Sequence, residues 1–284
     1  MTAFTDWIGR ETHSSDRLDE ALARRWLATF DLSQPETAAM PQGIHWCLCV
    51  PDTPSASLGE DGHPDRHARQ SFLPPFDAPR RMWAGSECEF HAPLQIGGAI
   101  TRSTRIDAIE KKTGSTGPLQ FLTLLHRTFT DGSLAVSEKQ TLVYRDAPPA
   151  GSSPAPPRLT ETSFDETGWD QVKRVTPSPE LLFRYSALTF NTHRIHYDAD
   201  YVRDVENYRG PIVHGPLMAS LLLQMVGRQL GSNALASFGF RALSPAIADE
   251  ELVLAMRANG SSIELGTFAA DGRQVLKTQA RLQP

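Results

Sequence analysis

Apolar residues recur along the chain with two spacings, and the first of them predicts helices. In residues 16–29, Leu18, Leu22 and Trp26 recur every four positions and so share one face. A helix with charged residues mostly on its other faces is therefore expected there. Residues 41–50 are apolar over a shorter run and predict either a second, short helix or a buried segment.

The longest helix signal has both ends marked. Gly215 and Pro216 precede an apolar run over residues 217–230, and Gly231 follows it. Proline is well tolerated at the first position of a helix, and glycine is common just past the end. Because the run leaves few polar positions, we predict a central helix that is buried on nearly all sides.

The second spacing is the alternation of apolar and polar residues that is typical of half-buried strands. Asp131-Gly132 and Asp271-Gly272 add hairpin turns, and Ser178-Pro179 marks the start of another helix. Strands are expected on both sides of Gly97-Gly98 within residues 81–114, and at 119–130, 134–145, 169–175, 235–243, 251–258, 262–268 and 274–282.

The order of these elements predicts a repeated α+β unit. Residues 146–158 are rich in Pro, Ser and Ala and nearly free of charge, which is typical of a linker. We therefore divide the chain into a first half (1–145), a linker (146–160) and a second half (161–284). Each half is expected to fold an antiparallel sheet over a helix, with the two sheets paired at their edges. The long irregular region 51–81 is expected to have a functional role.

Composition narrows the function. The 284 residues carry a formal net charge of −5, which argues against nucleic acid as the main partner. No apolar run reaches the roughly 20 residues of a membrane span, and the N-terminus lacks the pattern of a signal peptide. Cys47, Cys49 and Cys88 have no zinc or redox spacing, so we expect reduced thiols in a cytoplasmic protein.

Candidate chemistry gathers just before the central helix. Asn191, His193 and His196 lie within six residues, where the preceding helix has ended. A histidine with a pKa near 6.5 can exchange a proton at working pH, and an asparagine can orient a water or a carbonyl. The N–H of Gly215, at the start of a buried helix, can receive a developing oxyanion.

At these residues the chain resembles a known family. The stretches YSALTFNTHRIHYD and IVHGPLMASLLLQ are similar to the hydratase motif of the MaoC-like, (R)-specific enoyl-CoA hydratases. That resemblance implies the hotdog fold, a bent antiparallel sheet wrapped on a long helix. It also implies that His196 is the catalytic histidine and that the Gly215 N–H holds the thioester oxygen. Asn191 stands where the family has an aspartate, which leaves His196 as the main proton-transfer group.

The first half extends the resemblance. GEDGHP, FLPPFDAPRRMWAGSECEF and the strands up to VYRD are similar to the N-terminal hotdog of two-domain hydratases, the branch with itaconyl-CoA and mesaconyl-(C4)-CoA hydratases. The fold class implied is a double hotdog. The function implied is hydration of a 2-enoyl-CoA thioester without metal or cofactor, by a homodimer with no membrane or nucleic-acid partner. We favour short C5 dicarboxylic substrates such as itaconyl-CoA or mesaconyl-CoA.

Substrate-binding residues follow from this hypothesis. Trp83 and His214 are expected beside the substrate, and Arg81 is expected to pair with a free carboxylate. The other arginines that offer this pairing are Arg80, Arg184, Arg194 and Arg209.

Two other functions remain open on the same fold. A thioesterase would need a carboxylate on the central helix, and residues 217–230 contain none. A non-catalytic acyl-CoA binding protein is the second alternative, because Asn191 replaces the usual acid. A zinc site formed by His193, His196 and His214 is also conceivable, since three imidazoles can hold a catalytic zinc.

Overall fold

The strands of both halves join in one antiparallel sheet. The computed structural model describes residues 4–68, 71–114, 117–149 and 151–284. Its first half contributes β1 (Glu11–Arg17), β2 (Arg80–Phe90), β3 (Ala99–Gly114), β4 (Gly117–Thr130) and β5 (Ser133–Arg145). The second half contributes β6 (Gln171–Val175), β7 (Leu235–Ala242), β8 (Leu252–Asn259), β9 (Ser262–Ala269) and β10 (Gln274–Leu282).

The strand order has an internal symmetry. It runs β1-β3-β4-β5-β2-β7-β10-β9-β8-β6, so each half places its first strand at an outer edge and its second strand at the centre. The predicted repeat is therefore confirmed, and so is the pairing of the two sheets at their edges. That pairing is the β2–β7 contact, with Gly85 opposite Arg241 and Glu89 opposite Ser237. It leaves β1 and β6 as the only edges among the described strands.

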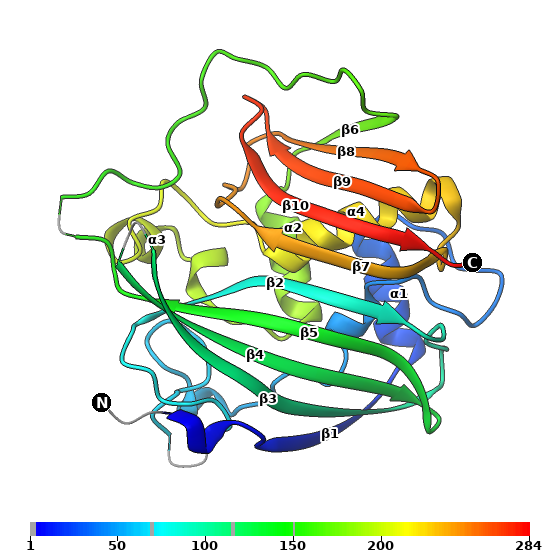
Figure 1. Cartoon of the computed structure of the whole chain (residues 1–284), viewed down its shortest axis with the longest axis horizontal. Helices are drawn as coiled ribbons and strands as arrows, with labels where there is room; N and C mark the ends of the chain where they lie inside the picture. The colour runs from blue at the N-terminus through cyan, green and yellow to red at the C-terminus, as the bar shows by residue number, and fades with distance from the viewer. Residues whose placement is uncertain (1–3, 69–70, 115–116, 150) are drawn as a thin grey trace.

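Helices α1 (Glu20–Thr29), α2 (Pro179–Leu188) and α4 (Gly215–Leu230) lie against the inner side of the curved sheet, whereas α3 (Ala199–Asp204) lies at the left side of the view in Figure 1. The short 3-10 turns are η1 (Phe4–Trp7), η2 (Ile44–Cys47), η3 (Ser55–Ser57) and η4 (Arg194–His196). Leu217, Leu222 and Met225 of α4 belong to the main apolar core together with residues of β7 and β9. The prediction of a buried central helix is confirmed.

Three expectations about local structure need correction. The first helix begins at Glu20 rather than at residue 16, because the Asp19 side chain accepts a hydrogen bond from Leu22 N at 2.6 Å and caps it there. Residues 16 and 17 belong to β1, which the apolar pattern did not predict. Helix α3 was also missed.

The connection between the halves has no helix or strand over its described residues until β6 begins at Gln171. It passes around the outside of the molecule to reach the far edge of the sheet (Figure 1). The limits of the linker, 146–160, stay a prediction.

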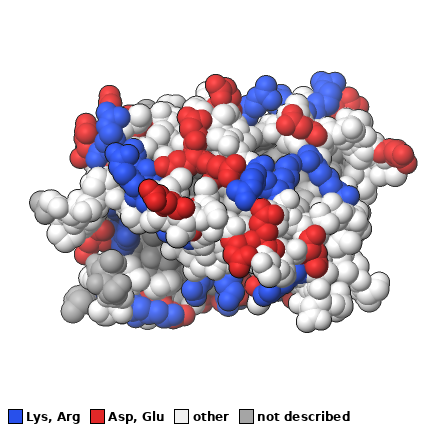
Figure 2. Space-filling view, turned by 90° about the horizontal axis from the view of Figure 1, so that it is seen from above, with Lys and Arg blue, Asp and Glu red and all other residues white. Residues whose placement is uncertain are grey.

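Charges on the surface are mixed. The face in Figure 2 carries acidic and basic side chains side by side, without a large area of one sign. Exposed ion pairs such as Arg174–Glu166 and Arg257–Glu264 also occur at the surface. None of the helices in the described part of the chain is long and apolar enough to cross a membrane.

Candidate active site

The turn after α2 carries Asn191 and His196, the two polar residues that the sequence analysis predicts in the site. Its geometry is set by Asn191, whose Oδ1 accepts a hydrogen bond from His193 N at 3.0 Å. The chain then enters the 3-10 turn η4, in which His196 N donates to His193 O at 3.1 Å. Both histidines are buried, whereas Asn191 is half-buried. One lone pair of Oδ1 is thus used by the backbone, and the amide N–H groups have no hydrogen-bond partner among the described residues.

His196 presents one bare ring nitrogen. Its Nδ1 lies 2.7 Å from the carbonyl oxygen of Ile212, and a carbonyl can only accept. Nδ1 therefore carries the hydrogen in the neutral ring, and Nε2 is left as an acceptor. Burial lowers the pKa of His196 to about 4, although the bond to Ile212 acts in the opposite direction. The ring is thus a neutral base at pH 7.

His214 holds the His196 ring from one side. The two rings are stacked, with centroids 3.5 Å apart and planes inclined by 17°. His214 is the N-cap residue of α4, and its Nε2 hydrogen-bonds Ser186 Oγ of α2 at 2.9 Å. Burial, together with the nearby His196, lowers the pKa of His214 well below its ordinary value. The start of the central helix thereby fixes the orientation of the candidate base.

Gly215 offers an open donor next to this stack. It is the first residue of α4, and its N–H has no acceptor within the described residues. A Cβ added there would meet only Trp83 O at 3.8 Å and the Phe240 ring at 3.9 Å, which are ordinary contacts. The protein itself therefore gives no steric reason for glycine at this position. A ligand that approaches the N–H closely would give one.

The long loop of the first half supplies two residues that sequence reasoning did not single out. Asp61 and His63 are joined by a hydrogen bond of 3.1 Å between Oδ2 and Nδ1. The His63 ring lies 4.0 Å from that of His193, which in turn lies 5.6 Å from that of His196. The only sequence signal was a cluster of titratable residues, GEDGHP, within a long loop.

This loop is fixed to the second half by backbone contacts. Gly62 has φ +84°, and a Cβ there would lie 2.0 Å from the carbonyl oxygen of Thr192. Thr192 Oγ1 donates to Gly62 O, and Arg194 N donates to Asp61 O at 2.9 Å. Only glycine permits both this conformation and this approach. The halves are thus joined where the histidines gather.

Burial, hydrogen bonds and a neighbouring charge together set the protonation states of Asp61 and His63. Burial would raise the pKa of Asp61, but its hydrogen bonds with His63 outweigh burial and lower the pKa to about 2. Burial and then the Arg81 guanidinium lower the pKa of His63 to about 4. At pH 7 Asp61 is therefore a carboxylate, which can only accept, and His63 is a neutral ring whose Nδ1 donates to it.

Of the five arginines proposed as carboxylate partners, four are already engaged. Arg80 is buried and forms an ion pair with Glu206 at 2.9 Å. Arg194 pairs with Asp198 and Arg209 with Glu250, while the exposed Arg184 donates to Ala28 O. Arg81 is half-buried and has no hydrogen bond or ion pair within the described residues. Its charge still lowers the pKa values of Asp61, His63 and His193, so it lies near the histidines.

Among the described residues, two groups of side chains contain donor atoms that could hold a metal. The conceived zinc set of His193, His196 and His214 is not among them: two of its rings are stacked, so their in-plane lone pairs do not converge. Asp61, His63 and His193 do have ligand atoms within 4.8 Å of one another, but the first two are already hydrogen-bonded together.

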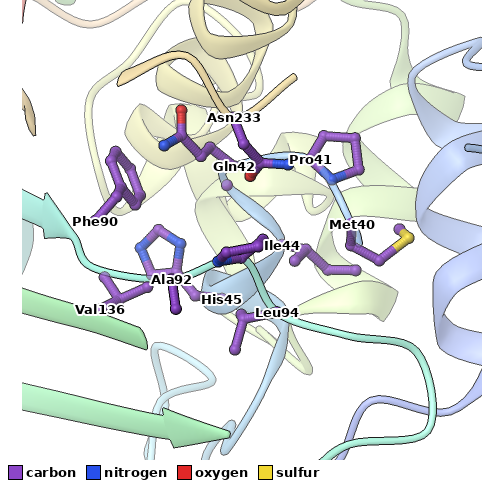
Figure 3. A pocket seen from close by; sticks show the side chains of 12 residues that line it. Met40, Pro41, Gln42, Ile44, His45, Phe90, Ala92, Leu94, Val136 and Asn233 are labelled. Atoms are coloured by element: carbon purple, nitrogen blue, oxygen red, sulfur yellow. The ribbon is translucent and has the colours of Figure 1, made fainter. Parts of the chain in front are cut away.

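The second group lies in the core of the first half. It consists of His45, Cys88 and Glu138, and Glu138 already accepts hydrogen bonds from Trp46 Nε1 and Ser86 Oγ. A cavity of about 10 Å³ beside His45 has room for about one water molecule (Figure 3). It is too small for an acyl chain.

Trp83 stands between this core and Gly215. Its Nε1 donates to Gly85 O at 3.1 Å and to Ser86 Oγ at 2.9 Å, and its carbonyl faces the start of α4. The side chain is half-buried and packs on the apolar core, so a contact with substrate stays a prediction. Phe76 is fully buried among residues of β3 to β5, which makes it a core residue rather than a pocket wall.

One antiparallel sheet, built from two like halves that each wrap on a helix, defines a protein of the double hotdog class. A family model described as hydroxyacyl-thioester dehydratase type 2 matches residues 43–248. The chain belongs to this family. It is 38% identical over 281 residues to a mesaconyl-C(4)-CoA hydratase of Chloroflexus aurantiacus, with 97% of this chain and 96% of that protein covered.

Solved structures agree on the fold. A MaoC-like dehydratase from Phytophthora capsici superposes with a TM-score of 0.72 at 16% identity, over 99% of this chain and 98% of that chain. A Mycobacterium tuberculosis protein with a double hotdog fold superposes with a TM-score of 0.56 at 17% identity, over 97% and 96%. The predictions of the family, of the double hotdog and of a hydro-lyase are confirmed.

The buried histidines make the fold sensitive to acid. A histidine with a pKa near 6.5 in the unfolded chain and about 4 in the folded protein binds its proton first in the unfolded state. The free energy of unfolding should therefore fall as pH falls from about 6.5 towards 4, with His196 alone accounting for on the order of 3 kcal/mol. Urea unfolding between pH 7.5 and 4.5 measures this. His196→Asn should flatten the slope, and the same change at the exposed His67 should not; equal slopes would contradict the assignment.

Proposed function

We propose that this protein adds water reversibly across the double bond of a 2-enoyl-CoA thioester, with His196 as the proton-transfer group. The observation that carries the proposal is the bare Nε2 of a neutral, buried imidazole held beside the open N–H of Gly215. A base positioned in this way can take a proton from water. The helix N-terminus can hold the thioester oxygen as negative charge develops on it.

The steps balance with water and substrate alone. The oxygen of water forms a bond to the β-carbon while one of its O–H bonds breaks, and the proton goes to His196 Nε2. The electron pair of the double bond moves towards the thioester oxygen at Gly215. The proton then passes from His196 to the α-carbon, which restores the neutral ring. Asn191 contributes by donating an amide N–H to the water, since its oxygen is engaged with the backbone.

For the substrate we propose a short dicarboxylic acyl-CoA of the mesaconyl-C(4) kind. The relative from Chloroflexus aurantiacus supports this, because it covers nearly the whole chain. In a mesaconyl thioester formed at C4, the free carboxylate is bonded to the same carbon that water attacks. A cation next to the proton-transfer group would bind that carboxylate, and Arg81 is the arginine near the histidines whose side chain has no partner among the described residues. A guanidinium can bind a carboxylate through two parallel hydrogen bonds.

Itaconyl-CoA stays a second candidate of the same class, and we keep the predictions of a homodimer and of a cytoplasmic location. No residue of α4 from Leu217 to Leu230 is acidic, so we do not favour thioester hydrolysis.

The reaction is tested by incubation with mesaconyl-C(4)-CoA, itaconyl-CoA and crotonyl-CoA. Loss of the enoyl absorbance means hydration, release of free thiol means hydrolysis, and neither means binding alone. His196→Ala should lower kcat by at least about 100-fold, the usual range for loss of a general acid or base. His67→Ala serves as control. Wild-type activity in His196→Ala would refute the role of His196.

Arg81→Ala should act on selectivity. We expect a strong rise in KM for the dicarboxylic substrates and little change for crotonyl-CoA, which has no second carboxylate. Arg184→Ala, at an exposed arginine of α2, is the matched control and should change neither. Equal losses on both kinds of substrate would instead place Arg81 against the CoA phosphates or in the scaffold.

A further inference from the structure

The water in this reaction is held most firmly by two acceptors, and His196 Nε2 is the one that the second half fixes through a hydrogen bond to the backbone. A water molecule has two hydrogens, and both must be held if a lone pair is to point steadily at the β-carbon. His196 Nε2 accepts one of them. Residue 191 is an asparagine, whose Oδ1 already accepts from His193 N and has no negative charge to strengthen a second bond. A second acceptor that is not already engaged therefore has to be another residue.

We propose that His63 is this second acceptor and a catalytic residue of the hydration, and that Asp61 is the positioning residue that keeps its Nε2 bare. The inference rests on the proposed function. The carboxylate that the motif lacks at Asn191 would then be supplied by Asp61 on the loop of the first half. Asp61 would act through the His63 ring rather than directly on the water. His63 would hold the second hydrogen of the water, which stays on oxygen as the product hydroxyl, while His196 moves the first.

The hydrogen bond to Asp61 carries the argument. An ionised carboxylate accepts the Nδ1–H of His63 at 3.1 Å, so the neutral ring must expose Nε2 as an acceptor. Asp61 Oδ1 also accepts from the backbone N–H of His63 at 2.9 Å, which fixes the carboxylate itself. This is the arrangement by which an aspartate sets the tautomer of a catalytic histidine in hydrolytic triads.

The loop has the rigidity that such a role requires. Gly59 N donates to His63 O and Gly62 N donates to Gly59 O, so residues 59–63 form a closed turn. The contact between Gly62 and Thr192 then fixes this turn against η4. The His63 side chain is about 17% exposed, so it is not closed off completely by the protein.

His193 is the rival for the same role, because it lies between the other two rings. Its ring nitrogens have no hydrogen bond to any described residue, so nothing sets its tautomer. Burial and then the neighbouring His63 and His196 lower its pKa well below the ordinary value, and no carboxylate offsets this. His63, with its carboxylate partner, is the better-prepared acceptor.

The closing experiment is steady-state hydration of mesaconyl-C(4)-CoA by full-length variants with unchanged circular dichroism. His63→Ala should lower kcat by at least about 100-fold with little change in KM. His63→Gln should recover part of the loss, because its amide oxygen can accept at the same place. Asp61→Asn keeps the shape but lets the ring adopt the other tautomer, so kcat should again fall by about 100-fold or more. His67→Ala, on the same loop but exposed, should match the wild type.

Each other outcome has a definite meaning. Activity of His63→Ala within about threefold of wild type overturns the inference and leaves the proposed function standing. A loss in His193→Ala without one in His63→Ala transfers the role to His193 and also overturns it. Inhibition of the wild type by a chelator, reversed by a divalent metal, would make Asp61, His63 and His193 a metal site instead. A wild type that hydrates none of the three thioesters would remove the proposed function and the inference together.

Discussion

The approach of Gly62 to the carbonyl of Thr192 is the constraint on which the candidate site depends. It joins a loop of the first half to the segment that carries His193 and His196, across 130 residues of sequence. No side chain fits there, since an added Cβ would lie 2.0 Å from the carbonyl oxygen. The line of imidazoles from His63 to His214 exists because this contact is made. The β2–β7 pairing joins the two sheets, whereas the loop contact joins the two halves at the histidines.

The two halves have the same strand order but contribute different residues to the candidate site. Each half has the same strand order, but only the second has a long helix at its centre, with an open N–H at its first residue. The first half has α1 and the small turn η2 in its core, and a long loop before β2. That loop extends over the neighbouring site. We therefore view the first half as a scaffold whose contributions to catalysis are Asp61, His63 and Arg81.

Much of the fold could be predicted from the sequence because its signals are local. The glycine and proline at the ends of α4, the Asp-Gly turns and the alternation in β3 to β5 act over a few residues. Strand β1 could not be predicted, because its sequence ETHSSDR is polar and exposed throughout and it is held mainly by pairing with β3, with one further bond from Cys49 N to Asp16. His196, Gly215 and Arg81 were found through a motif or a charge. Asp61 and His63 were not, because their role depends on a contact between residues far apart in sequence, and no local pattern indicates that the GEDGHP part of the long loop makes it.

The role of the contact between Gly62 and Thr192 is tested most directly by the hydration activity of Gly62→Ala, compared with that of Gly132→Ala. Both glycines have a positive φ, +84° and +81°, but a Cβ on Gly132 would meet nothing within 4 Å. The two changes therefore introduce similar backbone strain, and only the first pushes the loop away from Thr192. If the loop completes the site, Gly62→Ala should lose at least about 100-fold in kcat on mesaconyl-C(4)-CoA while Gly132→Ala stays near wild type. Full activity in Gly62→Ala would contradict the account.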